Sequence, residues 1–125
     1  MDLYQAEILE HYRHPLHRGV LDTADVVQRE HNPTCGDTLT FYLQFQDDVI
    51  TNITWEGEGC AISQAAASLL TDEIIGLTRS QIAAMQKEDV LKLLGIELGP
   101  TRLKCALLSL QGVTHAVNQK TNSST

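Results

Sequence analysis

The alternation of apolar and polar side chains predicts three β-strands in the first half of the chain. Residues 38–45, TLTFYLQF, place an apolar side chain at every second position, which is the period of a strand with one buried face. Residues 49–55, VITNITW, repeat this alternation. Their inward positions are Val49, Ile53 and Trp55. A shorter run at residues 26–31, VVQREH, is typical of an edge strand.

Turn residues set the limits of these strands. Asp47 and Asp48 stand between the two longer runs and predict a tight turn, so the runs form an antiparallel hairpin. The stretch EGEGC at residues 56–60 contains two glycines and predicts the end of the last strand. The first half of the chain therefore predicts a small antiparallel sheet of about three strands.

A helical period precedes the strands. Tyr4, Ile8 and Tyr12 recur at helical spacing and form a narrow apolar stripe. A residue before a proline is disfavoured in a helix, so Pro15 predicts that this first helix ends near residue 14.

After EGEGC the apolar period becomes helical again, and four more helices are predicted. Residues 61–76 carry a broad apolar face. Thr78 and Gln81 have the spacing of a capping box, which starts the next helix. Gly95 ends a short helix over KEDVLKLL, and Pro100 suits the first position of the last helix.

Leucines at helical spacing predict the buried face of the last helix. The members of this face are Leu103, Leu107, Leu110 and Val117. Gly112 lies inside the same helix, where glycine is unfavourable. Because strands come first and helices later, the predicted class is α+β, with helices packed on one face of the sheet. The length fits one domain over residues 1–117, followed by a polar, disordered tail over 118–125.

The charge excludes several classes of partner. The net charge is −7 at pH 7, whereas a surface for nucleic acid or anionic membrane needs clustered Lys and Arg. No apolar run reaches the ~18 residues that cross a bilayer, and the N-terminal MDLYQAEILEHY lacks the apolar segment of a signal peptide. We therefore expect a cytoplasmic protein that binds neither nucleic acid nor membrane.

The cysteines lie at predicted element boundaries. They are three, so they cannot all pair in disulfides, and in a reducing compartment such a set is typical of a metal or catalytic site. Cys35 lies in the loop HNPTCGD together with Asp37, and Cys60 and Cys105 lie near the starts of helices. A helix N-terminus lowers the pKa of a nearby thiol and favours the thiolate.

Three thiolates and a carboxylate form a sensible donor set for zinc or an iron–sulfur cluster, because thiolates select these over magnesium or calcium. The four negative charges are halved by Zn²⁺ or by a [2Fe–2S]²⁺ core, and helix N-termini with Arg102 and Lys104 would offset the rest. The long gaps between the cysteines match no local zinc-finger pattern. From the residues alone, three unrelated cysteines and an Asp37 that bonds its own turn remain alternatives.

Two other functions would use the same residues differently. A Cys–His hydrolase would take Cys35 or Cys60 as nucleophile and His115 as base, and it would leave the other cysteines idle. A purely structural zinc module would unfold without its metal. The histidines near the N-terminus are interpreted as surface or packing residues: His11, His14 and His17.

Four stretches of the chain resemble a known family. LYQAEILEHYRHPLHRG, HNPTCGD, GEGCAIS and LKCALL occur in this order, and together they resemble the NifU N-terminal family, which includes the IscU and SufU proteins of iron–sulfur cluster assembly. The resemblance extends from about residue 2 to residue 117. It implies an α+β fold in which three cysteines and one aspartate gather at an exposed end.

The resemblance also implies ligands and partners. The implied ligand set is Cys35, Asp37, Cys60 and Cys105. These residues would bind zinc or iron, or hold a transient [2Fe–2S] cluster. Cys35 would accept sulfur from a cysteine desulfurase of the SufS or IscS kind, and a downstream cluster carrier or apo-protein would receive the product. A zinc-dependent sulfurtransferase that activates the desulfurase without a scaffold role stays an alternative.

The chain combines features of the two branches. Lys104 stands where IscU-like scaffolds have a histidine, as in SufU-like proteins, and ELGPTRLK replaces the LPPVK-type segment that chaperones recognise. The spacing between Cys60 and Cys105 nevertheless looks free of the insertion that SufU-like proteins usually have. Lys104 favours the SufU-like branch.

Overall fold

The computed structural model describes residues 3–33 and 36–119, and Cys35 and residues 120–125 of the predicted tail lie outside this range. In chain order the elements are α1 (Leu3–Arg13), β1 (Val26–Asn32), β2 (Asp37–Gln46), β3 (Val49–Glu58), α2 (Ala61–Ile74), α3 (Arg79–Ala83), α4 (Lys87–Leu94) and α5 (Pro100–Asn118). The three strands form one antiparallel sheet in the order β1-β2-β3.

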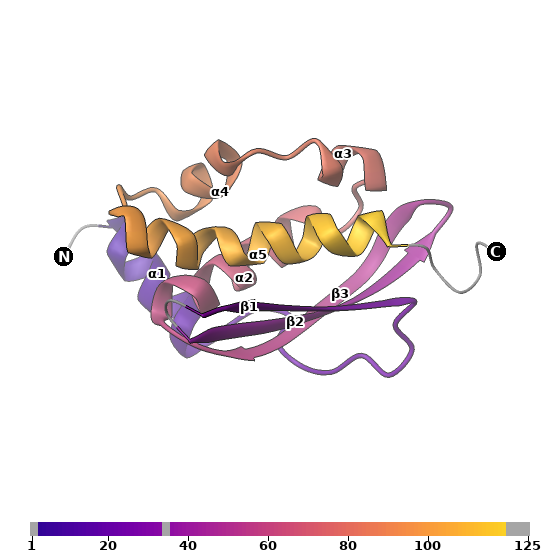
Figure 1. The fold of residues 1–125 in the computed structure, drawn as a ribbon, viewed down its shortest axis with the longest axis horizontal. Helices are drawn as coiled ribbons and strands as arrows, with labels where there is room; N and C mark the ends of the chain where they lie inside the picture. The colour runs from indigo at the N-terminus through magenta and orange to yellow at the C-terminus, as the bar shows by residue number, and fades with distance from the viewer. Residues whose placement is uncertain (1–2, 34–35, 120–125) are drawn as a thin grey trace.

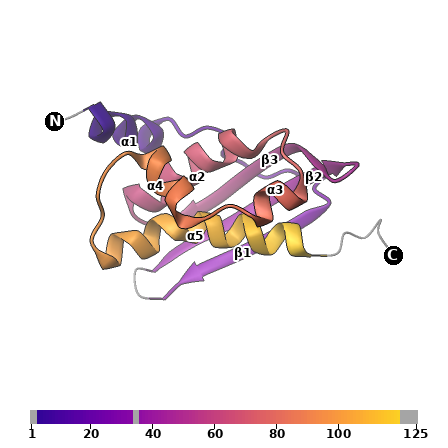
Figure 2. The same ribbon diagram turned by 90° about the horizontal axis from the view of Figure 1, so that it is seen from above.

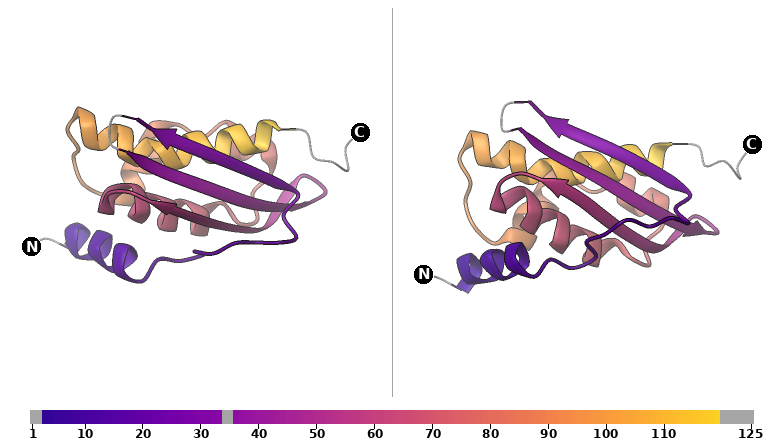
Figure 3. Two further views of the ribbon diagram at one scale, coloured as in Figure 1. Left: turned by 60° about the horizontal axis from the view of Figure 1, so that its bottom comes forward. Right: turned by 90° about the horizontal axis from the view of Figure 1, so that it is seen from below.

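The helices cover one face of the sheet, which confirms the predicted α+β class. Helix α5 packs on β1 and β2, and α2 packs on β3 (Figure 1). Seen from above, the helices lie in front of the strands, and seen from below the strands come forward with no described helix over them (Figures 2 and 3). Helix α1 packs against α2.

The hairpin between β2 and β3 forms at the predicted turn, where Asp47 and Asp48 have φ angles of 53° and 65°. The prediction that Val49 points inward is wrong, because Ile50 is the fully buried residue at this end of β3. The reason is a register shift between β2 and β3, because Gln44 pairs with Asn52 but the next residue, Phe45, pairs with Ile50. The inward positions of Ile53 and Trp55 are confirmed, since both are fully buried.

Strand β3 also runs further than predicted. It continues through Gly57 to Glu58, so the first glycine of EGEGC does not end it. A Cβ atom at Gly57 would lie 2.2 Å from the carbonyl oxygen of Thr38 on β2. This glycine therefore permits close strand pairing, as glycines in strands often do.

The predicted buried face of α5 is only partly confirmed, since Leu107 and Leu110 pack against the apolar clusters from its edge. Leu103, Leu107 and Leu110 are only half-buried, although Val117 is buried as predicted. The residues that point inward are mostly small: Cys105, Ala106, Leu108, Ser109, Gly112, Val113, Ala116 and Val117. A Cβ atom at Gly112 would lie 2.4 Å from Cε2 of Phe41 on β2. Gly112 thus permits a close approach of helix and sheet, rather than being a defect of the helix.

The predicted helix limits are confirmed. Helix α1 ends at Arg13, before Pro15. Thr78 and Gln81 form the capping box of α3, Gly95 ends α4 in a left-handed conformation with φ 70°, and Pro100 begins α5. Within the described residues, no helix has the length and apolar character needed to cross a membrane.

Candidate metal centre

Asp37 is the first residue of β2 and is buried, with 1% of its surface exposed. Its Oδ1 atom accepts a hydrogen bond of 2.9 Å from the main-chain N–H of Cys60. Gly59 has φ 150°, and a Cβ atom there would lie 2.1 Å from the same oxygen. The glycine therefore supplies the space in which the carboxylate reaches the chain before α2.

Cys60 is the exposed N-cap residue of α2, and this N-cap position confirms the predicted helix start. The Sγ atom accepts a hydrogen bond of 3.5 Å from the N–H of Ser63 and lies 3.8 Å from Oδ2 of Asp37. The hydroxyl of Ser63 donates to the carbonyl of Cys60 at 3.0 Å. The start of α2 thus fixes both the main chain and the side chain of this cysteine.

Cys105 approaches the same point from α5. It is the sixth residue of that helix and is buried, with 3% of its surface exposed. The favourable field of a helix N-terminus falls off within the first turn, so the start of α5 does not stabilise this thiolate as the sequence suggested.

Three predicted ligands converge. One oxygen of Asp37 and the Sγ atoms of Cys60 and Cys105 all lie within 4.8 Å of one another. In a tetrahedral zinc site, bonds of about 2.0–2.3 Å place ligand atoms about 3.5–3.8 Å apart, so small side-chain movements would complete the geometry. Two thiols and a carboxylate also suit zinc or iron chemically. Cys35, the fourth predicted ligand, lies outside the described residues.

Lys104 and Arg102 are exposed on the first turns of α5, and their role in offsetting the site's charge stays a prediction. Lys104 lines a cleft of about 260 Å³ beside the end of β1. The other lining residues are His31, Asn32, Pro33, Leu107, Leu108 and Gln111.

Two polar residues that the sequence did not indicate hold the main chain next to Cys60. Arg18 donates to the carbonyl of Gly57 at 3.1 Å and to Oε1 of Gln64 at 3.2 Å, and Gln64 Nε2 donates to the carbonyl of Gly59 at 3.0 Å. The available signal was Gln64 itself, a long polar side chain in the apolar run of α2, one turn after Cys60.

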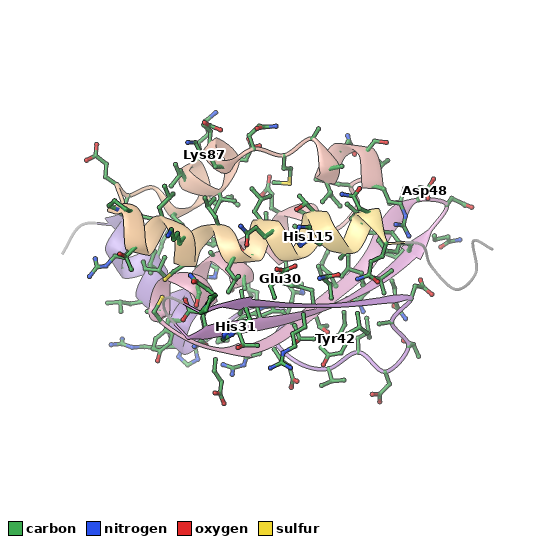
Figure 4. The ribbon with its side chains drawn as sticks, viewed as in Figure 1. Glu30, His31, Tyr42, Asp48, Lys87 and His115 are labelled. Carbon is green, nitrogen blue, oxygen red and sulfur yellow. The ribbon has the colours of Figure 1, made fainter. Side chains whose placement is uncertain are left out.

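The geometry contradicts a hydrolase that pairs Cys60 with His115, whereas Cys35, the other predicted nucleophile, lies outside the described residues. His115 lies about 15 Å along α5 from Cys105, at 1.5 Å per residue. Its Nδ1 atom is 2.5 Å from Oε1 of Glu30 on β1, and Figure 4 shows these two side chains facing each other. His115 is therefore not a base for the described thiols.

The N-terminal histidines have the packing and surface positions that were predicted. His11 Nδ1 lies 2.8 Å from the Ser68 hydroxyl, and His17 Nε2 lies 3.0 Å from Oδ1 of Asp72. His14 is exposed.

The chain is similar to known proteins over nearly its whole length. The model of the NifU-like N terminal domain matches residues 3–124. The chain is 33% identical to the iron-sulfur cluster assembly scaffold protein IscU of Streptococcus pyogenes serotype M1, over 97% of this chain and 86% of that protein. It is also 33% identical to the zinc-dependent sulfurtransferase SufU of Bacillus subtilis strain 168, over 92% of this chain and 89% of that protein.

Solved structures share the fold. A candidate iron-sulfur cluster assembly scaffold protein for the SUF system from Fervidobacterium islandicum AW-1 superposes with a TM-score of 0.79 at 25% identity, covering 94% of this chain and 96% of that one. The N-terminal part of a nitrogen-fixing NifU-like protein from Brucella abortus gives a TM-score of 0.75 at 27% identity, covering 92% of both chains.

Proposed function

The chain belongs to the NifU-like N-terminal domain family, and from this membership we propose that it takes part in iron–sulfur cluster assembly. In this proposal Cys35, Asp37, Cys60 and Cys105 bind zinc or iron, and the protein accepts sulfur from a cysteine desulfurase. The observation that carries the proposal is the convergence of one carboxylate and two thiols from three separate elements.

The donor set supports a labile site. Most clusters are held by four cysteines, and a carboxylate in place of one thiolate is the weaker ligand for an iron–sulfur core. Such a ligand would let iron and sulfide, the cargo, leave for a carrier or apo-protein. Bound zinc would hold the thiols as thiolates until a partner arrives.

Cys35 is the proposed sulfur acceptor. Its thiolate would attack the outer sulfur of the desulfurase persulfide, the S–S bond of that persulfide would break, and the desulfurase cysteine would leave as a thiolate. The outer sulfur would then form a new persulfide on Cys35, with no net oxidation. Thiolate metal sites are typical of a reducing compartment, so we place the protein in the cytoplasm.

A zinc-dependent sulfurtransferase without a scaffold role is the second candidate. Lys104 beside Cys105 favours it, because this position distinguishes the two branches that the sequence resembles. The two functions share the site and the sulfur-accepting step, and they differ in whether a cluster is ever built on the protein.

The test measures alanine release by the desulfurase of the same organism, with and without the zinc-loaded protein. We expect a many-fold rise that Cys35→Ala abolishes. Cys60→Ala is the comparison, because it removes a metal ligand but keeps the acceptor thiol. No stimulation despite demonstrated binding would exclude sulfur transfer as the main role. Anaerobic reconstitution with ferrous iron and sulfide then separates the candidates, because only a scaffold develops the absorbance of a [2Fe–2S] cluster.

A further inference from the structure

Two side chains hold the main chain that carries Cys60 into the site. The guanidinium of Arg18 donates to the carbonyl of Gly57 at 3.1 Å and to Oε1 of Gln64 at 3.2 Å. The amide nitrogen of Gln64 donates in turn to the carbonyl of Gly59 at 3.0 Å. These hydrogen bonds connect the end of β3, the loop and the first turn of α2.

The peptide group between Gly59 and Cys60 is held at both ends. Its carbonyl oxygen accepts from Gln64, and its N–H donates to Oδ1 of Asp37 at 2.9 Å. Rotation of this peptide would break both hydrogen bonds and turn the Cys60 side chain away from Asp37. Gln64 and a predicted ligand therefore fix one peptide plane from opposite sides.

This clamp, formed by Arg18 and Gln64, acts on a segment whose main-chain conformation depends on glycine. Gly59 has φ 150°, a conformation that is open almost only to glycine. Gln64 is itself buried, with 7% of its surface exposed, and the Arg18 guanidinium can only donate, so its contact fixes which end of the Gln64 amide faces Gly59.

Arg18 has a rigid support. Its guanidinium lies 5.5 Å from the ring centroid of Trp55, a fully buried residue of β3. The main chain on either side is paired with the same residue, since Trp55 N–H donates to the carbonyl of His17 and Gly19 N–H donates to the carbonyl of Trp55. The clamp is thus anchored in the core of the sheet.

We propose that Arg18 and Gln64 are positioning residues for the Cys60 ligand, and that they keep its thiol turned toward Asp37 and Cys105 for a thiophilic metal ion. This inference rests on the proposed function of the site. Groups that orient ligands from outside the coordination sphere typically change metal affinity by about 10–100-fold when mutated. We expect a loss of that size without loss of the fold.

Two conservative variants test the clamp. Gln64→Glu keeps the acceptor for Arg18 but places a carboxylate oxygen against the carbonyl of Gly59. Arg18→Lys keeps the charge, but a single ammonium lacks the fork that reaches two acceptors at fixed geometry. Arg79→Lys is the matched control, because Arg79 also donates to a carbonyl, that of Val117 at 2.7 Å, and lies 3.8 Å from the Phe45 ring centroid.

The probes are Zn²⁺ and Co²⁺ bound to the full chain. We expect zinc release to a chelator to be about 10–100-fold faster in both clamp variants and unchanged in the control. The thiolate-to-Co²⁺ charge-transfer absorbance should fall in the clamp variants, a signal that a merely less stable fold would not change. Thermal melting of the apoproteins measures folding separately. If Gln64→Glu does not fold, zinc release from Arg18→Lys and Gln64→Met tests the positioning role instead.

The outcomes separate this inference from the proposed function. Wild-type protein that binds neither ion would remove the proposed metal site. Tight binding by the wild type, with release rates within twofold in all folded variants, would overturn the positioning role alone.

Discussion

Asp37 uses its two oxygens differently. Oδ1 accepts from the N–H of Cys60, and Oδ2 lies 3.8 Å from the sulfur of the same residue. A carboxylate held through one oxygen can present the other to a metal ion without changing its rotamer. The space for this arrangement depends on the absence of a side chain at Gly59.

We therefore expect Gly59→Ala to damage the site. The new methyl group would lie 2.1 Å from Oδ1 of Asp37, and φ 150° is strained for alanine. Backbone strain of this kind costs about 1–3 kcal/mol, so urea denaturation should show lower stability. Titration with Zn²⁺ should show weaker binding, because Asp37 must move.

Gly99→Ala is the control for that substitution. Gly99 precedes α5 and has φ −69°, and a methyl group added there would have no atom within 4 Å. Its replacement should change stability by less than about 1 kcal/mol and leave zinc affinity intact. Equal effects of the two substitutions would contradict the steric argument.

Individual site residues were predictable to different degrees. The position of Cys60 followed from the change of period after EGEGC, and the structure confirms it. The burial of Cys105 did not follow from the sequence, because a leucine pattern locates a helix along the chain better than it defines which face is buried. The convergence of Asp37, Cys60 and Cys105 depends on how α2 and α5 pack on the sheet, which spacing along the chain does not encode.

At the scale of elements, α5 approaches the sheet through small residues. Gly112 packs directly on Phe41, and Ala106, Ser109 and Ala116 are fully buried around it. This close contact explains why Leu103, Leu107 and Leu110 are only half-buried, although Leu108 is buried. The apolar pattern predicted a buried face made of leucines. Close packing of α5 on the sheet instead places mostly small side chains on that face.

Gly112→Ala should consequently destabilise the protein. Alanine gains about 1 kcal/mol of helix propensity over glycine, but overpacking against Phe41 costs about 1–3 kcal/mol. We expect a net loss of about 1 kcal/mol in urea denaturation. Gln111→Ala, an exposed neighbour on the same helix, should not destabilise. A gain in stability for Gly112→Ala would show that α5 can shift to admit the methyl group.

Ser68 joins α2 to the segment after α1. It is fully buried, and its hydroxyl accepts from the N–H of Leu16 at 2.8 Å and lies 2.8 Å from Nδ1 of His11. Ser68→Ala would leave the Leu16 N–H without this acceptor and should cost about 1–3 kcal/mol. Amide exchange at Leu16 should become faster, whereas Ser80→Ala on the exposed side of α3 should alter neither quantity.

Element limits were the most predictable part of the fold. The capping box at Thr78, the left-handed Gly95 and the proline that begins α5 are local signals, and the structure places each as predicted. The register shift before Phe45 was not predictable, because it depends on the pairing between two strands.

At the scale of the molecule, the apolar side chains form two clusters that do not include the ligand cysteines. The larger cluster is centred on Trp55, Phe41 and Leu70, and a second cluster lies between α2, α4 and α5 around Val90 and Leu94. Neither cluster contains Cys60 or Cys105. The fold therefore has a source of stability that is independent of any bound metal.

Metal removal should leave the protein folded. With excess chelator we expect the far-UV circular dichroism of a helical protein at 25 °C, and added zinc should raise the melting temperature by mass action. A purely structural zinc module predicts a different result, because its chain unfolds without metal. A random-coil spectrum after chelation would therefore favour that alternative.

The strand order has a consequence for how a bound ion would escape. Asp37 begins β2, the central strand, and is paired with Asn32, while the next residue is paired with Glu58. Cys60 instead caps a helix end, where local opening requires only the loss of the few hydrogen bonds that hold Gly59 and Cys60. In native-state hydrogen exchange the β2 amides should be the last to open and the first turn of α2 among the earliest. Release of a bound ion would then begin with movement of the Cys60 thiol, while the Asp37 carboxylate stays in place.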